Sequence, residues 1–182
     1  RMGACSIAPG GLFLPSADRG IVVCEDGMDE VSFPEMKGRR VVKFALRAEV
    51  TAHAAGSVAV AARKGKVVLI YRGGTWALRA EIRPAAEVRS LAISPDGATL
   101  AVHGEDGSLV LHDIDSGKVL STRPGGGSGS GGIAFSPDGQ RVFLHDAGFT
   151  AHEVDARTGK DLGVYRTGSW LTAVRYVSGG AV

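Results

Sequence analysis

Histidine is the residue type in this 182-residue sequence that is best suited to metal chemistry. His103 and His112 correspond approximately to His145 and His152 in a second, similar segment, and paired strands could present such imidazoles as ligands. No cysteine or carboxylate cluster completes a tetrahedral set, and repeated segments carry like residues at equivalent positions for packing. We therefore expect no metal site and no cofactor.

The carboxylates also have the spacing of structural residues. They lie in turns and loops, where an aspartate accepts hydrogen bonds from backbone amides. The six concerned are Asp96, Asp106, Asp113, Asp115, Asp138 and Asp155. The serines lie in turns or glycine-rich loops, there is no Gly-x-Ser-x-Gly nucleophile elbow, and no histidine adjoins a cysteine. The sequence therefore predicts no catalytic residue and no enzyme.

The two cysteines, Cys5 and Cys24, are expected to be free thiols. The strand pattern puts them on two strands of one sheet with a third strand between them. Two strand spacings are about 9 to 10 Å, which exceeds the roughly 7 Å limit for a disulfide.

Composition narrows the function classes. The chain contains 27 glycines and 7 prolines, which indicates many turns and few long helices. Its net charge is only +2 and no basic tract is present, so a dedicated nucleic-acid binder is not expected. No apolar run is long enough to span a membrane, and the first residues lack a basic segment followed by an apolar one. We expect a cytoplasmic protein that does not bind membranes.

An internal repeat organises the chain. The segment from Ser94 to Gly97 recurs from Ser136 to Gly139, an offset of 42, and Gly117-Lys118 recurs as Gly159-Lys160 at the same offset. Two degenerate copies precede these segments, and a partial copy follows them. Such a period is typical of a repeat architecture.

Each repeat has the pattern of four short antiparallel strands. Alternating apolar residues are interrupted by Asp-Gly pairs, for which we expect two-residue hairpin turns with positive φ at both central residues. In the first repeat the turn is placed at Gly20. Four strands every 42 or so residues predict an all-β fold, a β-propeller of four-stranded antiparallel blades. The expected blades are 3–37, 42–84, 87–123 and 130–168, with an extra strand at 171–177.

The third repeat carries a family resemblance. Glu105-Asp106-Gly107, a strand, and then His112-Asp113 followed by Ser116-Gly117-Lys118 resemble a bacterial WD-repeat, as does the segment from Trp170 to Tyr176. His112 stands where that family usually has tryptophan, so the family's hydrogen-bonded His, Asp, Ser and Trp network is expected to be missing. The Ser-Pro-Asp-Gly turns also resemble the propeller of prolyl-oligopeptidase-type enzymes, the alternative relative.

The resemblance implies a ring of seven or eight blades, of which this chain would supply about four blades and one strand. The segment Pro124 to Gly132 is then expected to be a surface loop between blades, and Met36 to Arg40 a small basic loop.

The resemblance also implies a function, a non-catalytic scaffold for protein interactions. Partners of the family commonly dock on the loops that enter the innermost strands, which makes Arg89, Glu105, Trp170 and Thr172 the candidate contacts. The expected partner is another protein, the remaining part of the same polypeptide, or a second copy that completes the ring. The alternative function is that of a substrate-gating propeller in a larger hydrolase.

Overall fold

The computed structural model describes residues 7–13, 18–61, 65–127, 129–146, 149–166 and 168. Within these residues the chain forms strands only, arranged in four antiparallel sheets of four strands each, with the strands of each sheet in sequence order. The all-β fold of four-stranded blades is therefore confirmed. We call the sheets blades 1 to 4 in chain order.

The strands alternate with short turns. Blade 1 comprises β1 (Ile7–Phe13), β2 (Arg19–Cys24), β3 (Gly27–Ser32) and β4 (Lys37–Lys43). Blade 2 comprises β5 (Val50–Ala54), β6 (Ser57–Ala61), β7 (Val68–Arg72) and β8 (Leu78–Ile82). Blade 3 comprises β9 (Val88–Ile93), β10 (Thr99–Gly104), β11 (Leu109–Asp113) and β12 (Val119–Arg123). Blade 4 comprises β13 (Gly129–Phe135), β14 (Arg141–Asp146), β15 (Thr150–Asp155) and β16 (Asp161–Arg166).

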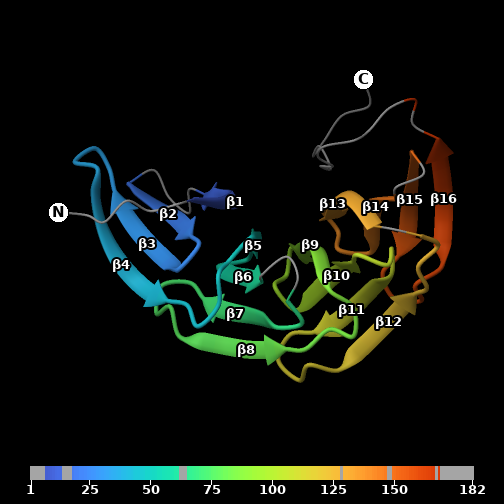
Figure 1. The fold of residues 1–182 in the computed structure, drawn as a ribbon, viewed down its shortest axis with the longest axis horizontal. Coiled ribbons are helices and arrows are strands. Elements are labelled where there is room, and N and C mark those ends of the chain that lie inside the picture. Colours follow the sequence, from blue (N-terminus) through green and yellow to red (C-terminus); the bar gives the residue numbers. More distant parts are fainter. Residues whose placement is uncertain are drawn as a thin grey trace.

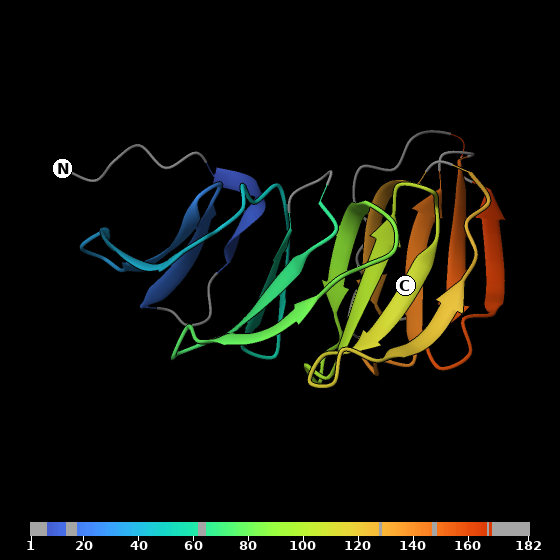
Figure 2. The same cartoon turned by 60° about the horizontal axis from the view of Figure 1, so that its bottom comes forward.

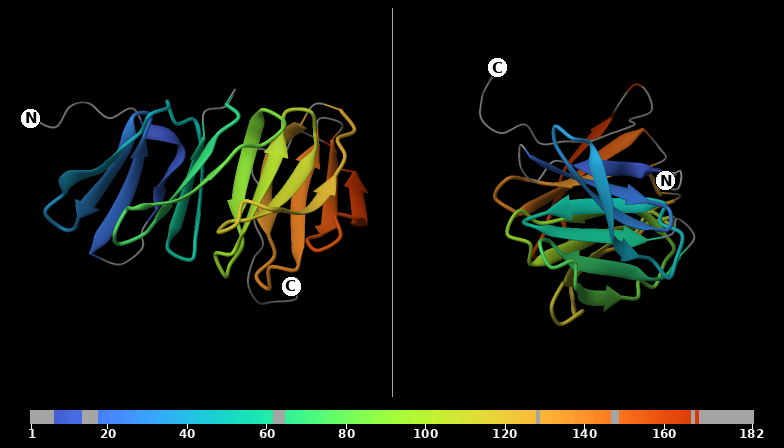
Figure 3. Two further views of the ribbon diagram at one scale, coloured as in Figure 1. Left: turned by 90° about the horizontal axis from the view of Figure 1, so that it is seen from below. Right: turned by 90° about the vertical axis from the view of Figure 1, so that its left-hand side faces the viewer.

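The four blades stand face to face in an open arc. Figure 1 shows the first strand of each blade on the concave side of the arc and the last strand on the convex side. Strand β5 contacts both β1 and β9, and β9 contacts β13, so these innermost strands are neighbours along the arc. Figures 2 and 3 show the same order from other directions, with blades 1 and 4 at opposite ends.

Apolar side chains between neighbouring blades form three cores. The core between blades 2 and 3 includes Ile70, Val68, Leu91, Leu100 and Ile114. The core between blades 1 and 2 includes Ile21, Val23, Met28, Val58 and Tyr71, and that between blades 3 and 4 includes Leu109, Leu111, Phe135, Leu144 and Val154. Since both faces of an inner blade are buried, its middle strands are apolar on both sides, as in Ser57–Ala61, which is buried along its whole length.

The Ser-Pro-Asp-Gly turns differ in detail from the expected hairpin. The amide of Gly97 donates to the carbonyl of Ser94, and only Gly97, with φ of 72°, enters the left-handed region; Asp96 does not. Blade 4 repeats this turn at Gly139, with φ of 71°. The loop is longer than a two-residue primed turn, so one glycine supplies all the left-handed conformation that it needs.

Three expectations for blade 1 are wrong. Gly20 lies inside β2, not at a turn, and the segment expected as a basic loop runs into strand β4 at Lys37. Cys24 is not a free thiol but is disulfide-bonded. The reason is topological: β1 is the direct neighbour of β2, with Ile7 opposite Cys24, so no strand separates the start of β1 from Cys24. The other cysteine, Cys5, lies outside the described residues.

The glycine-rich segment after β12 packs closely on its own blade. A Cβ on Gly125 would collide with the backbone oxygen of Asp106 and lie 2.9 Å from the amide nitrogen of Ser108. A Cβ on Gly107, whose φ is 78°, would lie 2.6 Å from the carbonyl oxygen of Gly127. The glycines therefore allow the loop to rest on the 105–108 turn.

Candidate functional site

We distinguish two ends of each blade. The lower end carries the Ser-Pro-Asp-Gly turns and the turns before the outermost strands, such as 113–118. The upper end carries the turns between the two middle strands, such as 105–108, and the connections between blades. Each end is built of turns held by a rigid sheet, the usual arrangement for a binding surface.

Two of the four expected contact residues lie together at the upper end of blade 3. Arg89 is near the start of β9, and Glu105 follows β10, which is the neighbour of β9. The amide of Glu105 donates to the carbonyl of Glu87 over 2.9 Å, so the turn and the incoming chain are tied together. Both side chains are half-buried. The other two, Trp170 and Thr172, lie outside the described residues, as does the expected strand 171–177.

Five of the six aspartates have the expected local role in turns. Asp96 accepts from the amide of Ala98 over 3.0 Å, and Asp106 and Asp138 accept from the equivalent amides. Asp113 and Asp155 accept from amides three residues ahead, at 2.8 and 2.7 Å. These hydrogen bonds lower the pKa of each carboxyl, with the bond from a neighbouring hydroxyl, such as Ser94 on Asp96, as the largest cause.

Asp115 is the exception, because its partner is on another blade. Its carboxylate receives two hydrogen bonds from the Arg79 guanidinium of β8, at 2.8 and 3.1 Å. Arg79 also donates to the carbonyl of Gly97 and to the hydroxyl of Ser57, at 2.8 and 3.2 Å. One arginine of blade 2 therefore joins two lower turns of blade 3.

The histidines form no metal site among the residues that the structure describes, where no group of three or more potential ligands gathers. His103 and His145 are equivalent and fully buried. His112 and His152 are not equivalent: His112 is opposite Leu100, whereas the residue opposite the corresponding Val142 is Val154. Two buried ring nitrogens, Nε2 of His103 and Nε2 of His112, have no hydrogen-bond partner within the described chain.

A charged network between blades 3 and 4 was not anticipated from the sequence. Arg123 of β12 donates to Asp161 of β16 over 2.8 Å and lies 3.0 Å from Nδ1 of His152. The other ring nitrogen of His152 lies 3.0 Å from a carboxylate oxygen of Asp146. The three blade 4 residues lie on three different strands, so their spacing in the sequence contains no signal of the cluster.

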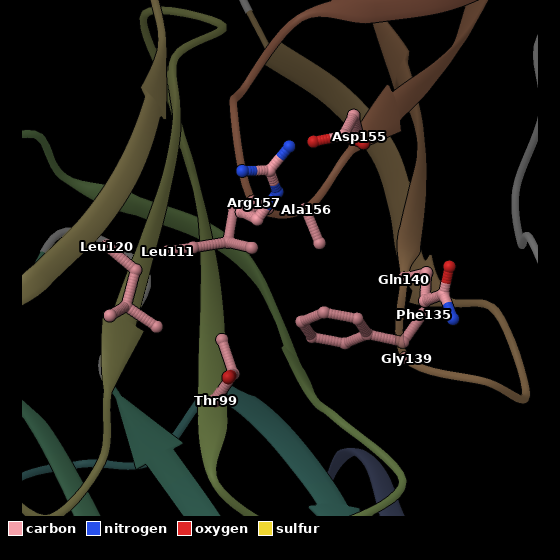
Figure 4. Close-up of a pocket in the computed structure, with 9 residues that line it drawn as sticks. All are labelled: Thr99, Leu111, Leu120, Phe135, Gly139, Gln140, Asp155, Ala156 and Arg157. Atoms are coloured by element: carbon pink, nitrogen blue, oxygen red, sulfur yellow. The ribbon is translucent and has the colours of Figure 1, made fainter.

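A groove with a mixed polar and apolar lining lies at the lower end, between blades 3 and 4 (Figure 4), with a volume of about 450 Å³. Leu111 and Phe135 form its apolar base, and Ala156 extends this base. Its rim is polar: Thr99, Gln140, Asp155 and Arg157 line it, together with Leu120 and Gly139. This size lies within the range of ordinary ligand pockets.

Comparisons with family models and solved structures show which known proteins this chain resembles. The family model described as the anaphase-promoting complex subunit 4 WD40 domain matches residues 52–129, which is less than half of the chain. No curated protein matches the sequence significantly. Among solved structures, Hsv2 of Kluyveromyces lactis matches with 20% identity and a TM-score of 0.65, over 80% of this chain and 48% of the other.

Two further structures agree. The Hsv2 of Kluyvelomyces marxianus matches with 15% identity and a TM-score of 0.70, over 87% of this chain and 54% of the other. The computationally designed Ika8 protein matches with 19% identity and a TM-score of 0.74, over 92% of this chain and 52% of the other.

The chain thus spans about half the length of the structures that it matches. These likenesses show the fold, and the bacterial type expected from the sequence stays a prediction. No helix long and apolar enough to cross a membrane occurs in the described part of the chain. The described residues form a partial β-propeller, and the comparisons support a propeller of the WD40 type.

Proposed function

We propose that this chain is a non-catalytic platform for protein interactions, and that its partner docks on the upper end of blade 3. The observation that carries the proposal is that Arg89, near the start of β9, and Glu105, in the turn after the neighbouring strand β10, lie at the same end of the blade on a turn fixed by close packing. The turn is held from one side by Glu87 and from the other by Gly125. A preorganised surface binds without a large cost in loop ordering.

The carboxylates support a binding role over a catalytic one. Five of the aspartates considered are committed to turn amides and the sixth to Arg79, so none of them is available as an acid or base. The comparisons give no support to the hydrolase-gating alternative, which we do not propose. Partners in the proposal are another protein, the rest of a longer polypeptide, or a second copy; nucleic acid and membrane are not included.

The experiment is a binding measurement with matched charge changes at the two ends of blade 3. A partner is isolated by affinity capture with cross-linking, purified, and titrated against the protein. We expect Arg89→Glu and Glu105→Arg each to weaken binding about tenfold or more, as for a central interface residue. Lys118→Glu makes the same charge change as Arg89→Glu at an exposed site of the lower end, and it should have little effect on binding. Equal effects from both ends, or failure to find any partner, would contradict the proposal.

A further inference from the structure

The groove between blades 3 and 4 has an equivalent between blades 2 and 3, and that equivalent is filled. The carbonyl of Gly97 and the hydroxyl of Ser57 there receive hydrogen bonds from the Arg79 guanidinium, whose side chain is only 15% exposed. The same guanidinium makes a bidentate pair with Asp115. The chain therefore fills the groove between blades 2 and 3, the first groove, with its own Arg79 side chain.

Backbone hydrogen bonds establish which residues correspond. The amide of Arg72 donates to the carbonyl of Ala77, and that of Asp113 to the carbonyl of Lys118. Two residues beyond each acceptor lie Arg79 and Leu120, which are therefore equivalent. In the same way, Asp113 matches Asp155, because each accepts at its carbonyl from the glycine four residues later. Asp115 consequently corresponds to Arg157, and Ile114 to Ala156.

Three differences leave the groove between blades 3 and 4, the second groove, open. Leu120 replaces the arginine that fills the first groove, and it is 52% exposed. Ala156 replaces Ile114, which is fully buried, so the second groove has a smaller side chain at its base. Arg157 replaces the acceptor Asp115, so the charge at the rim changes sign. The second groove lacks both the internal arginine and the carboxylate that held it.

The turn that forms the rim is held in place from two sides. The hydroxyl of Ser121 on blade 3 donates to the carbonyl of Ala156 over 2.7 Å. The amide of Ala156 donates to the carbonyl of Gln140 over 2.9 Å. A Cβ on Gly159 would collide with the carbonyl oxygen of Thr122, so this turn lies directly against the last strand of blade 3. The groove is therefore formed before any occupant arrives.

The lining defines the occupant. Leu111 and Phe135 at the base call for an apolar group (Figure 4). Arg157 at the rim is exposed, and its charge helps to lower the pKa of the nearby Asp155 carboxyl. The nearby Asp155 carboxylate already accepts from the amide and hydroxyl of Thr158, both at 2.7 Å. A guanidinium beside an apolar hollow pairs best with a carboxylate.

We propose that this groove is a second docking site, for a segment of a partner protein in which an apolar side chain lies next to an aspartate or glutamate. The apolar side chain contacts Leu111, Phe135 and Ala156, and the carboxylate pairs with Arg157. This proposal rests on the proposed function but concerns the opposite end of the blades from Arg89 and Glu105.

The test is a titration of the isotope-labelled protein with capped hexapeptides, followed by NMR. The central residue pair is Leu-Glu, Leu-Gln, Leu-Lys or Ser-Glu, with glycine and serine elsewhere. We expect the Leu-Glu peptide to bind at millimolar concentration or below, with amide shifts at Leu111, Phe135 and Ala156. The Leu-Gln and Leu-Lys peptides should bind about fivefold or more weakly, the value of about 1 kcal/mol for a partly exposed ion pair.

Variants that copy the filled groove between blades 2 and 3 provide the controls. Ala156→Ile fills the base and should abolish binding, whereas Arg157→Asp should reverse the preference from Leu-Glu to Leu-Lys. The double variant Leu120→Arg with Arg157→Asp should rebuild the internal plug, close the groove and leave the protein folded. Lys160→Asp makes the same charge change on the same turn, outside the lining residues, and should alter affinity less than about twofold.

Several results would overturn the proposal: no binding of the Leu-Glu peptide at several millimolar, equal binding by Ala156→Ile, or no dependence on charge. A change of solution mass with Arg157→Asp would identify a second copy as the occupant and would also overturn it. If the peptides fail while Arg89→Glu still weakens the purified partner, only the groove proposal fails and the proposed function stands.

Discussion

The burial of His103 predicts that the protein loses stability in mild acid. Its side chain is fully buried on β10, Nδ1 lies 3.4 Å from the hydroxyl of Ser90, and Nε2 has no described partner. Burial lowers the pKa of His103 from 6.5 to about 4, helped by the charges of Arg123 and Arg89 and opposed by Asp106 and Asp146. The folded state therefore holds a neutral imidazole where the unfolded state would hold a cation.

The size of the effect follows from proton linkage. Between pH 6.5 and 4 the His103 imidazole is protonated in the unfolded chain but neutral in the folded chain. The free energy of unfolding therefore falls as the pH falls. At about 1.4 kcal/mol per pKa unit, His103 contributes a slope of about 1.2 kcal/mol per pH unit near pH 5. The loss reaches about 3 kcal/mol at pH 4, and the contribution is fully present above pH 6.5.

The assay is urea unfolding from pH 4 to pH 8, compared between the protein and His103→Ala. Alanine suits this position because Ala61 occupies it in blade 2: Ala61 is opposite Val68, as His103 is opposite Leu109. Burial also lowers the pKa of His112, which adds to the slope in both proteins, so the difference between slopes isolates His103. If the free energy of unfolding fell equally steeply with pH in both proteins below pH 6.5, the reasoning would be refuted, whatever the difference between their stabilities at pH 8.

Three further predictions concern the turns, the link between blades and the open arc. Gly125→Ala should lower the free energy of unfolding by about 1 to 3 kcal/mol, because its Cβ meets the Asp106 backbone, whereas Gly126→Ala, with open space around it, should change it by less than about 0.5 kcal/mol; equal losses in chemical denaturation would contradict this. Arg79→Leu should lower the free energy of unfolding by about 1 to 2 kcal/mol, mainly because the hydrogen bond to the Gly97 carbonyl is lost. A double-mutant cycle with Asp115→Ala should show a coupling below about 1 kcal/mol, because that carboxylate is 70% exposed, and a larger coupling would assign the link to the ion pair. Light scattering should give a mass above the 18.8 kDa of one chain, because blade 4 exposes an aromatic pair on the side away from blade 3. The ring centroids of this pair, Phe143 and Tyr165, are 6.3 Å apart, and Tyr165 is half-exposed. A stable monomer would contradict this prediction.

Local signals in the sequence predicted the blades well. The Ser-Pro-Asp-Gly segments at 94–97 and 136–139 end one strand and begin the next in the structure, because serine and aspartate accept turn amides and glycine adopts positive φ. Blade 1 was predicted less well. It lacks an Asp-Gly pair at its first turn, and the turn was placed at Gly20, inside β2.

Contacts between blades could not be read in the same way. The link from Arg79 to Asp115 joins residues 36 apart, and that from Arg123 to Asp161 residues 38 apart. The outermost strands β8 and β12 each contain a register shift, opposite the step from Ile70 to Tyr71 in β7 and from Leu111 to His112 in β11, and Arg79 is itself the extra residue of β8. Such a shift changes which side chain points to the next blade, and it leaves no simple period in the sequence.

The sequence by itself determined the repeat, the strand order within each blade and the structural role of most turn aspartates, because these depend on φ preferences and on hydrogen bonds between near neighbours. Only the tertiary structure decided which blade faces meet and where a hollow remains. Arg79 fills the place between blades 2 and 3, whereas Leu120, Ala156 and Arg157 leave the equivalent place between blades 3 and 4 open. These residues become neighbours only when the blades pack.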